Sequence, residues 1–164
     1  MKDSPVITAA KVMAGKAHEG QTRKYSSLPY IVHPIEVATI VESAGGTDEM
    51  IAAALLHDVI EDTDFTYEDI ADLVQGMTEV AKPEDGNRAK RKSMDKDFLA
   101  QQSPEVQTIK YADVISNTQD IALHDPSFAK VYITEIKALL EVIDKGDPTL
   151  YAKAKDIVHA IKIK

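Results

Sequence analysis

Apolar positions recur at helical spacing along nearly the whole chain, and no segment shows the strict alternation of a half-buried strand. Glycine, proline and serine separate the apolar segments at predicted turns. The fold class predicted is all-α, a compact bundle in a single domain spanning residues 1–164. The predicted helices are 6–18, 33 up to Gly45-Gly46, 47 onward, a short one between 66 and 76, 88–100, 103–123, 128–144 and 148–161.

Local capping signals indicate where several of these helices begin. Pro34 fits a first helical turn, which places His33 near the N-cap. Thr47 fits the N-cap of the third helix. Thr66 and Asp69 resemble a capping box, with Asp in place of the usual Glu. These signals put one imidazole, that of His33, at the start of a helix.

The third predicted helix is apolar on almost its whole circumference until ionisable residues arrive. Residues 50–56 have the pattern of a buried helix. At about 100° per residue, His57 and Glu61 lie about 40° apart, as do Asp58 and Asp62. Three crowded carboxylates repel one another unless they are solvated, protonated or bound to a cation. The pattern fits either a cation site or a solvent-facing helix end.

A narrow polar stripe follows the helix predicted at 103–123. Asp113, Asn117 and Asp120 fall within an arc of about 60° on a helical wheel, with apolar residues on both flanks. An exposed stripe on a surface helix has the same pattern. Apolar cover on so many sides favours burial, and a buried acid needs a partner such as a metal ion.

Two imidazoles and two carboxylates are therefore candidate ligands of one divalent cation. This donor set suits Mn²⁺ or Fe²⁺, with Zn²⁺ possible. Four protein ligands leave positions open for water or substrate, and Glu61 or Asp62 could then handle protons in metal-assisted hydrolysis. The candidate ligands are His33, His57, Asp58 and Asp113.

The remaining histidines fit other roles. His124-Asp125 repeats the His-Asp dipeptide but precedes Pro126 in a predicted turn, so it is interpreted as a loop feature. His18 and His159 are interpreted as helix-face or surface histidines.

Composition excludes several classes of function. The chain has no cysteine, which excludes disulfides, zinc-thiolate sites and cysteine nucleophiles. The longest apolar run, 50–56, is far too short to span a membrane, and the N-terminus lacks the apolar core of a signal peptide. We therefore expect a cytoplasmic protein with no membrane association.

The charge distribution points away from nucleic acid. The formal net charge is −8, which argues against general nucleic-acid binding. Residues 82–92 are locally positive, with five basic and two acidic residues. Arg23-Lys24 forms a second basic spot. These segments are either solvated surface or sites for a small anionic ligand.

Four motifs, in order, resemble the HD-domain metal-dependent phosphohydrolases. Within these, the chain is similar to the hydrolase domain of the RelA/SpoT stringent-response enzymes and to the stand-alone small alarmone hydrolases. The motifs are AHEGQTRK at 17–24, PYIVHPIEVA at 29–38, AALLHDVIEDT at 53–63 and IKYAD at 109–113, followed by Asn117.

The resemblance implies an HD-domain helical bundle that removes the 3′-pyrophosphate from (p)ppGpp and returns GDP or GTP. It implies Mn²⁺ held by His33, His57, Asp58 and Asp113. It also implies that Glu61 and Asp62 activate or position the attacking water. The implied substrate-binding residues are Arg23 and Lys24 against the base and ribose, Asn117 on the base side, and, by a looser match, Arg88 and Arg91 toward the phosphates.

Two departures from the family pattern leave the base preference open. Val114 stands where relatives often carry Lys or Arg, and residues 25–28 replace the common Ser-Gly type of loop. One alternative is therefore an HD-type hydrolase of another nucleotide: ppApp, NADPH or a nucleoside monophosphate. Another is a catalytically silent nucleotide-binding module.

The C-terminal part of the chain leaves the oligomeric state open. Its apolar residues could complete the core or form a dimer face, and we expect the core. We also expect no synthetase or regulatory domain after Lys164. The apolar residues concerned are Val131, Ile133, Ile136, Leu139, Leu140 and Ile143.

Overall fold

The computed structural model describes residues 4–59 and 81–161. The chain divides into two compact units, Met1–Thr78 and Glu79–Lys164. In the described ranges the regular structure is helical apart from one isolated bridge between Thr22 and Pro29, which confirms the all-α prediction.

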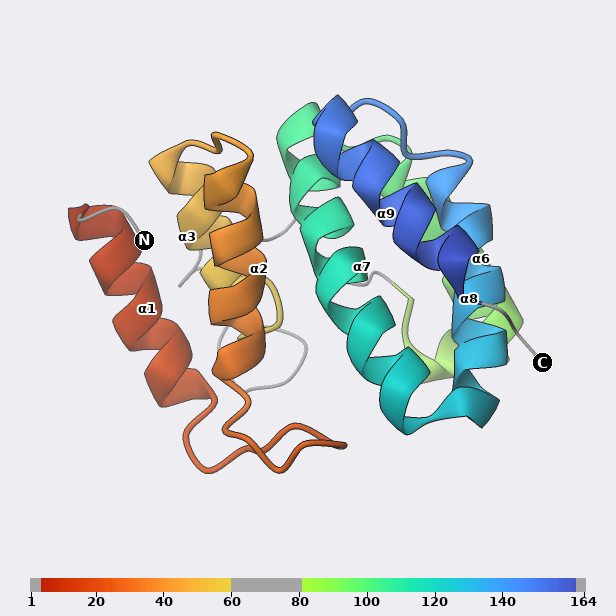
Figure 1. Ribbon diagram of the computed structural model, residues 1–164, viewed down its shortest axis with the longest axis horizontal. Helices are drawn as coiled ribbons and strands as arrows, with labels where there is room; N and C mark the ends of the chain where they lie inside the picture. The colour runs from red at the N-terminus through yellow and green to blue at the C-terminus, as the bar shows by residue number, and fades with distance from the viewer. Residues whose placement is uncertain (1–3, 60–80, 162–164) are drawn as a thin grey trace. The chain divides into compact units, whose positions relative to one another are not determined.

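The N-terminal unit is built around its third helix. Helices α1 (Pro5–Ala17) and α2 (Val32–Ser43) both pack against α3 (Asp48–Leu56) (Figure 1). Every residue of α3 from Met50 to Leu56 is buried, as its apolar circumference predicts. Thr47 caps α3 by accepting a hydrogen bond from the Met50 N–H, as predicted. The buried apolar residues of α1 and α2 include Ile7, Ala10, Ala14, Val37, Ala38 and Val41.

A closed loop joins α1 to α2. The Arg23 N–H donates to the Leu28 carbonyl at 2.8 Å, and the Tyr30 N–H donates to the Gln21 carbonyl at 2.9 Å. Ser27, with φ of 56°, turns the chain inside the shorter of these two closures, between Arg23 and Leu28. The loop therefore holds the predicted basic spot, Arg23-Lys24, directly before the helix that carries His33.

Helix α2 begins at Val32, so His33 lies in its first turn, two residues after the N-cap residue Ile31, as predicted. One prediction in this unit needs correction. His18 is 3% exposed and packs its ring against Tyr30, so the surface interpretation of His18 was wrong. The loop folds back over the end of α1, which a helical wheel cannot reveal.

The C-terminal unit is centred on a long helix. Helix α7 (Pro104–His124) packs against α8 (Pro126–Leu140) and α9 (Pro148–Ala160) (Figure 1). A 3₁₀ turn, η2 (Pro83–Asp85), precedes helix α6 (Arg88–Leu99). Of the apolar residues predicted for this core, five are buried, whereas Val131 is 47% exposed.

Helix α8 starts and ends earlier than predicted. Asp125 caps it, Pro126 occupies its first turn, and it ends at Leu140 instead of 144. Residues 141–147 form a loop bound to α7: the Lys145 N–H donates to the Gln107 side chain, and the Asp147 N–H donates to the Thr108 hydroxyl. These contacts are long-range, so the local pattern does not show them.

No helix in ranges 4–59 and 81–161 combines the length and apolar character that crossing a membrane requires.

Candidate metal centre

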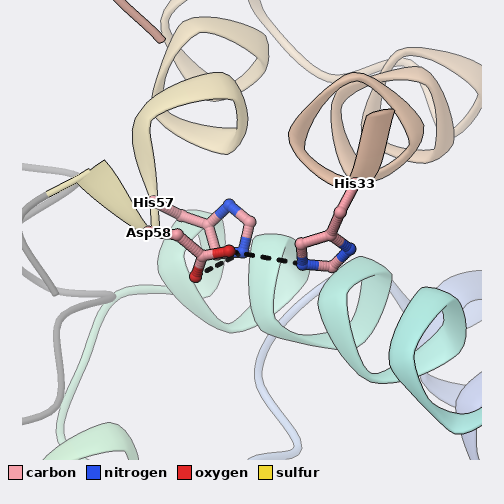
Figure 2. Close-up of side chains that lie close together, drawn as sticks. All are labelled: His33, His57 and Asp58. Atoms are coloured by element: carbon pink, nitrogen blue, oxygen red, sulfur yellow. Dashed lines mark ion pairs between the residues drawn. The ribbon is translucent and has the colours of Figure 1, made fainter. Parts of the chain in front are cut away.

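Three of the four predicted ligands lie together in the N-terminal unit. His33 comes from the first turn of α2, and His57 and Asp58 follow directly after α3 (Figure 2). One potential ligand atom from each side chain lies within 4.8 Å of the other two. Both imidazoles are 3% exposed, and the Asp58 side chain is 15% exposed. The chain thus gathers two buried nitrogen donors and one partly accessible carboxylate at one place.

Asp58 lies between the two imidazoles. Its Oδ1 atom is 3.0 Å from Nε2 of His57, and its Oδ2 atom is 3.4 Å from Nε2 of His33. The two rings meet edge to face, with centroids 5.2 Å apart. The Nε2 atoms of both rings therefore face the same carboxylate.

The orientation of His57 follows from the end of α3. Its Nδ1 atom lies 2.8 Å from the carbonyl oxygen of Ala54, which can only accept, so Nδ1 carries a proton. In a neutral imidazole Nε2 then presents a lone pair to Asp58 Oδ1 at 3.0 Å. Two facing lone pairs repel, so a proton or a metal ion is needed between them. A carbonyl-bound Nδ1 with Nε2 toward the ion is the usual arrangement of a metal-ligating histidine, and this donor set fits a divalent metal.

Tyr30 is a residue of this cluster that the sequence analysis missed. Its hydroxyl donates to Asp58 Oδ2 at 2.8 Å. Tyr30 lies in the turn before α2 begins at Val32, so helical spacing offers no signal for it.

The fourth predicted ligand, Asp113, lies on α7 in the C-terminal unit. It is 5% exposed, as the apolar flanks of its stripe predict. Lys110 Nζ contacts Oδ2 at 2.8 Å, and Asn117 Nδ2 donates to Oδ1 at 2.6 Å. The polar stripe is thus a hydrogen-bonded set, and both oxygens of this carboxylate have a partner on the same helix.

The predicted substrate-binding residues of the two basic segments each contact a nearby group of the protein. Arg23 reaches Glu36 at 3.5 Å, and the Lys24 ammonium lies 4.9 Å from the centroid of the Tyr25 ring. Arg91 donates to the Gly86 carbonyl at 2.9 Å.

Arg88 is held by a carboxylate. Its Nε and Nη2 atoms donate to the two oxygens of Glu135 at 2.7 and 2.8 Å. This hydrogen bonding raises the pKa of the Arg88 guanidinium above its ordinary value. The pair connects α6 to α8, a contact that the sequence analysis did not foresee.

The two predicted catalytic carboxylates, Glu61 and Asp62, and the predicted short helix between 66 and 76 lie outside the described residues.

The chain belongs to the HD-domain family, whose pattern it matches over residues 10–138. It is 40% identical to the guanosine-3′,5′-bis(diphosphate) 3′-pyrophosphohydrolase of Vibrio cholerae over 92% of its length, and 33% identical to the bifunctional (p)ppGpp synthase/hydrolase SpoT of Escherichia coli over 95%. It spans about a quarter of the length of these two relatives, 25% and 26%.

Solved structures share the fold. One, described as a metazoan orthologue of SpoT that hydrolyses ppGpp and plays a role in starvation responses, is 25% identical, with a TM-score of 0.85 over 100% of this chain and 99% of that one. A Listeria monocytogenes protein is 23% identical, with a TM-score of 0.66 over 83% of this chain and 98% of that one. The HD-domain bundle expected from the motifs is thus confirmed.

Proposed function

We propose that this chain is a metal-dependent hydrolase that removes the 3′-pyrophosphate of (p)ppGpp-type nucleotides. The observation that carries the proposal is the His33, His57 and Asp58 cluster, with three potential ligand atoms within 4.8 Å of one another. The names of the two curated relatives and the description of the metazoan structure support this choice of substrate.

The metal is proposed to be Mn²⁺, bound by the three clustered residues together with Asp113. Imidazole and carboxylate donors suit first-row divalent ions, so Fe²⁺ and Zn²⁺ are the competing occupants. A divalent ion, when bound, polarises a phosphoryl oxygen and makes water more acidic.

The protein residues have separate roles in this proposal. Glu61 or Asp62 positions the attacking water and accepts its proton. One water adds across the bond between the 3′ oxygen and its phosphorus, so that pyrophosphate leaves and the 3′ hydroxyl is restored. Arg23 and Lys24 bind the base and ribose, and Asn117 binds the base side.

The basic segment at 82–92 offsets substrate charge in the proposal. Arg91 and Arg88 are directed to the phosphates, because guanidinium groups pair well with phosphate oxygens. Glu135 already orients the Arg88 guanidinium through Nε and Nη2, so Nη1 is the nitrogen that Arg88 would offer.

Product identification tests the function. Purified protein loaded with Mn²⁺ is incubated separately with ppGpp, ppApp and NADPH, and phosphate and pyrophosphate release are measured separately. We expect GDP and pyrophosphate from ppGpp. Turnover of ppApp or NADPH alone would support a hydrolase that acts on a different nucleotide. Tight nucleotide binding without turnover would make the chain a binding module.

A further inference from the structure

We propose that Tyr30 is a positioning residue of the metal centre, whose hydroxyl holds the Asp58 carboxylate in its ligating orientation. The inference rests on the metal centre of the proposed function and adds a residue to it. Tyr30 donates to Asp58 Oδ2 at 2.8 Å, and that oxygen is the one 3.4 Å from His33 Nε2. The phenol therefore binds the carboxylate oxygen that faces the imidazole of His33.

The kind of donor matters for a metal ligand. A phenol fixes one oxygen of the carboxylate without adding a positive charge, so the negative charge stays available to a cation. A lysine in the same place would offset that charge, as Lys110 does for Asp113. Fixing the side chain in advance also removes part of the entropy cost of ordering it when a metal binds.

Tyr30 is itself held on several sides. Its ring packs against that of His18, with centroids 4.7 Å apart. The Nδ1 atom of His18 lies 2.8 Å from Oε1 of Gln21, and the Gln21 carbonyl accepts the Tyr30 N–H. The Tyr30 carbonyl in turn accepts the His33 N–H at 2.9 Å. These contacts fix the position of Tyr30, and its hydroxyl is thereby directed at Asp58.

The same loop carries the proposed nucleotide contacts. Arg23 and Lys24 lie between the Gln21–Tyr30 backbone bond and the turn at Ser27. Tyr30 therefore joins this loop to a metal ligand. Its loss should weaken metal binding first and turnover as a consequence.

Titration of Mn²⁺ by calorimetry into the metal-free protein tests this. The Tyr30→Phe variant keeps the ring and its packing on His18 and removes the hydroxyl alone. Loss of such a supporting hydrogen bond typically weakens metal binding by about 10- to 100-fold, and we expect that range here. Tyr25→Phe, which removes a hydroxyl from the same loop, should bind Mn²⁺ as the unmodified protein does, and Asp58→Asn should bind it least.

The metal dependence of turnover gives a second readout. Raising the Mn²⁺ concentration should restore most of the turnover of Tyr30→Phe but not that of Asp58→Asn, because only the former keeps every ligand. Tyr30→Phe with unchanged Mn²⁺ affinity would overturn the positioning role and leave the metal centre standing. An unmodified protein that binds no Mn²⁺ would overturn both.

Discussion

Two carboxylates, Asp58 in the N-terminal unit and Asp113 in the C-terminal unit, have apolar neighbours in the sequence but different surroundings in the structure. Asp58 is contacted by two imidazoles and a phenol, none of which carries a permanent charge. Asp113 is contacted by the Lys110 ammonium and the Asn117 amide. Burial of an acid in an apolar helical context therefore does not by itself indicate an ion site, since the protein can supply the positive charge.

The two units also differ in how they use their other polar groups. In the N-terminal unit, the clustered residues come from the first turn of α2, from the loop before it and from the residues directly after α3. In the C-terminal unit, polar groups of α7 fasten a loop: Gln107, Thr108 and Tyr111 all bond to residues 143–147. Substitutions in the cluster of His33, His57 and Asp58 should mainly change metal binding and turnover, and those in the contacts between α7 and residues 143–147 should mainly change stability.

The largest effect is expected for Asp58→Ala. Loss of a ligand should cost more than the roughly 10- to 100-fold typical of supporting residues, so pyrophosphate release should fall by more than about 100-fold. Initial rates at saturating Mn²⁺ measure this. Asp97→Ala, at an exposed position on α6, is the matched control. Turnover within tenfold of the unmodified protein would remove Asp58 from the site.

Gly146→Ala should lower stability by about 1–3 kcal/mol, the usual cost of overpacking. A Cβ atom there would lie 2.6 Å from Cε2 of the buried Tyr111 and 2.8 Å from the Thr108 backbone nitrogen. Gly15→Ala in α1 is the control, because its Cβ would have no neighbour within 4 Å and alanine favours a helix. Urea unfolding of both variants should show opposite signs; equal changes would contradict the tight contact at 146.

Lys110→Met should destabilise the metal-free protein by about 1–2 kcal/mol, because the Asp113 carboxylate loses a charged hydrogen bond. Lys130→Met, at an exposed position on α8, provides the comparison. Equal unfolding midpoints for the two variants would show that Lys110 does not balance Asp113, and the contrast with Asp58 would disappear.

Arg23→Ala should raise KM for ppGpp by about tenfold, which corresponds to about 1.4 kcal/mol, with a smaller change in kcat. The reason is that the proposed role of Arg23 is in ground-state binding of the nucleotide. Lys11→Ala removes an exposed charge from α1 and should leave both constants unchanged. A fall in kcat at constant KM would exclude Arg23 from nucleotide binding.

The last prediction concerns alkaline pH. Burial raises the pKa of Tyr111 to about 12, against about 10 for an exposed tyrosine. Because the folded-state pKa is the higher one, this contribution to stability is complete below about pH 10 and is lost as the pH rises toward 12. Thermal unfolding of Tyr111→Phe between pH 9 and 12 should show a shallower decline than the unmodified protein. An identical decline would show that ionisation of Tyr111 does not contribute to the loss of stability at alkaline pH.

Much of the helical framework is predictable from the sequence, because periodicity and capping are local. The starts of α3 and α7, with Thr47 and Ser103 as caps, follow from adjacent residues. The end of α8 at Leu140 was missed because apolar spacing continues to Ile143, while the loop bonds to α7 that end the helix are long-range.

The candidate site was predictable only in its ligand types. His33, His57 and Asp58 were named from their chemistry, and they lie together in the structure. The hydroxyl of Tyr30 and the burial of His18 depend on how a loop folds back, which residue spacing does not encode. The convergence of Asp113 with the other three ligands stays a prediction.

His57 and Asp58 follow directly after α3, so the length of that helix sets the direction in which they face His33. Inserting or deleting one residue in that helix would swing His57 and Asp58 by about 100° around its axis, whereas a change of a whole turn would return them to the same side. Natural length variants of this segment should therefore come in steps of three or four residues, with single-residue changes selected against.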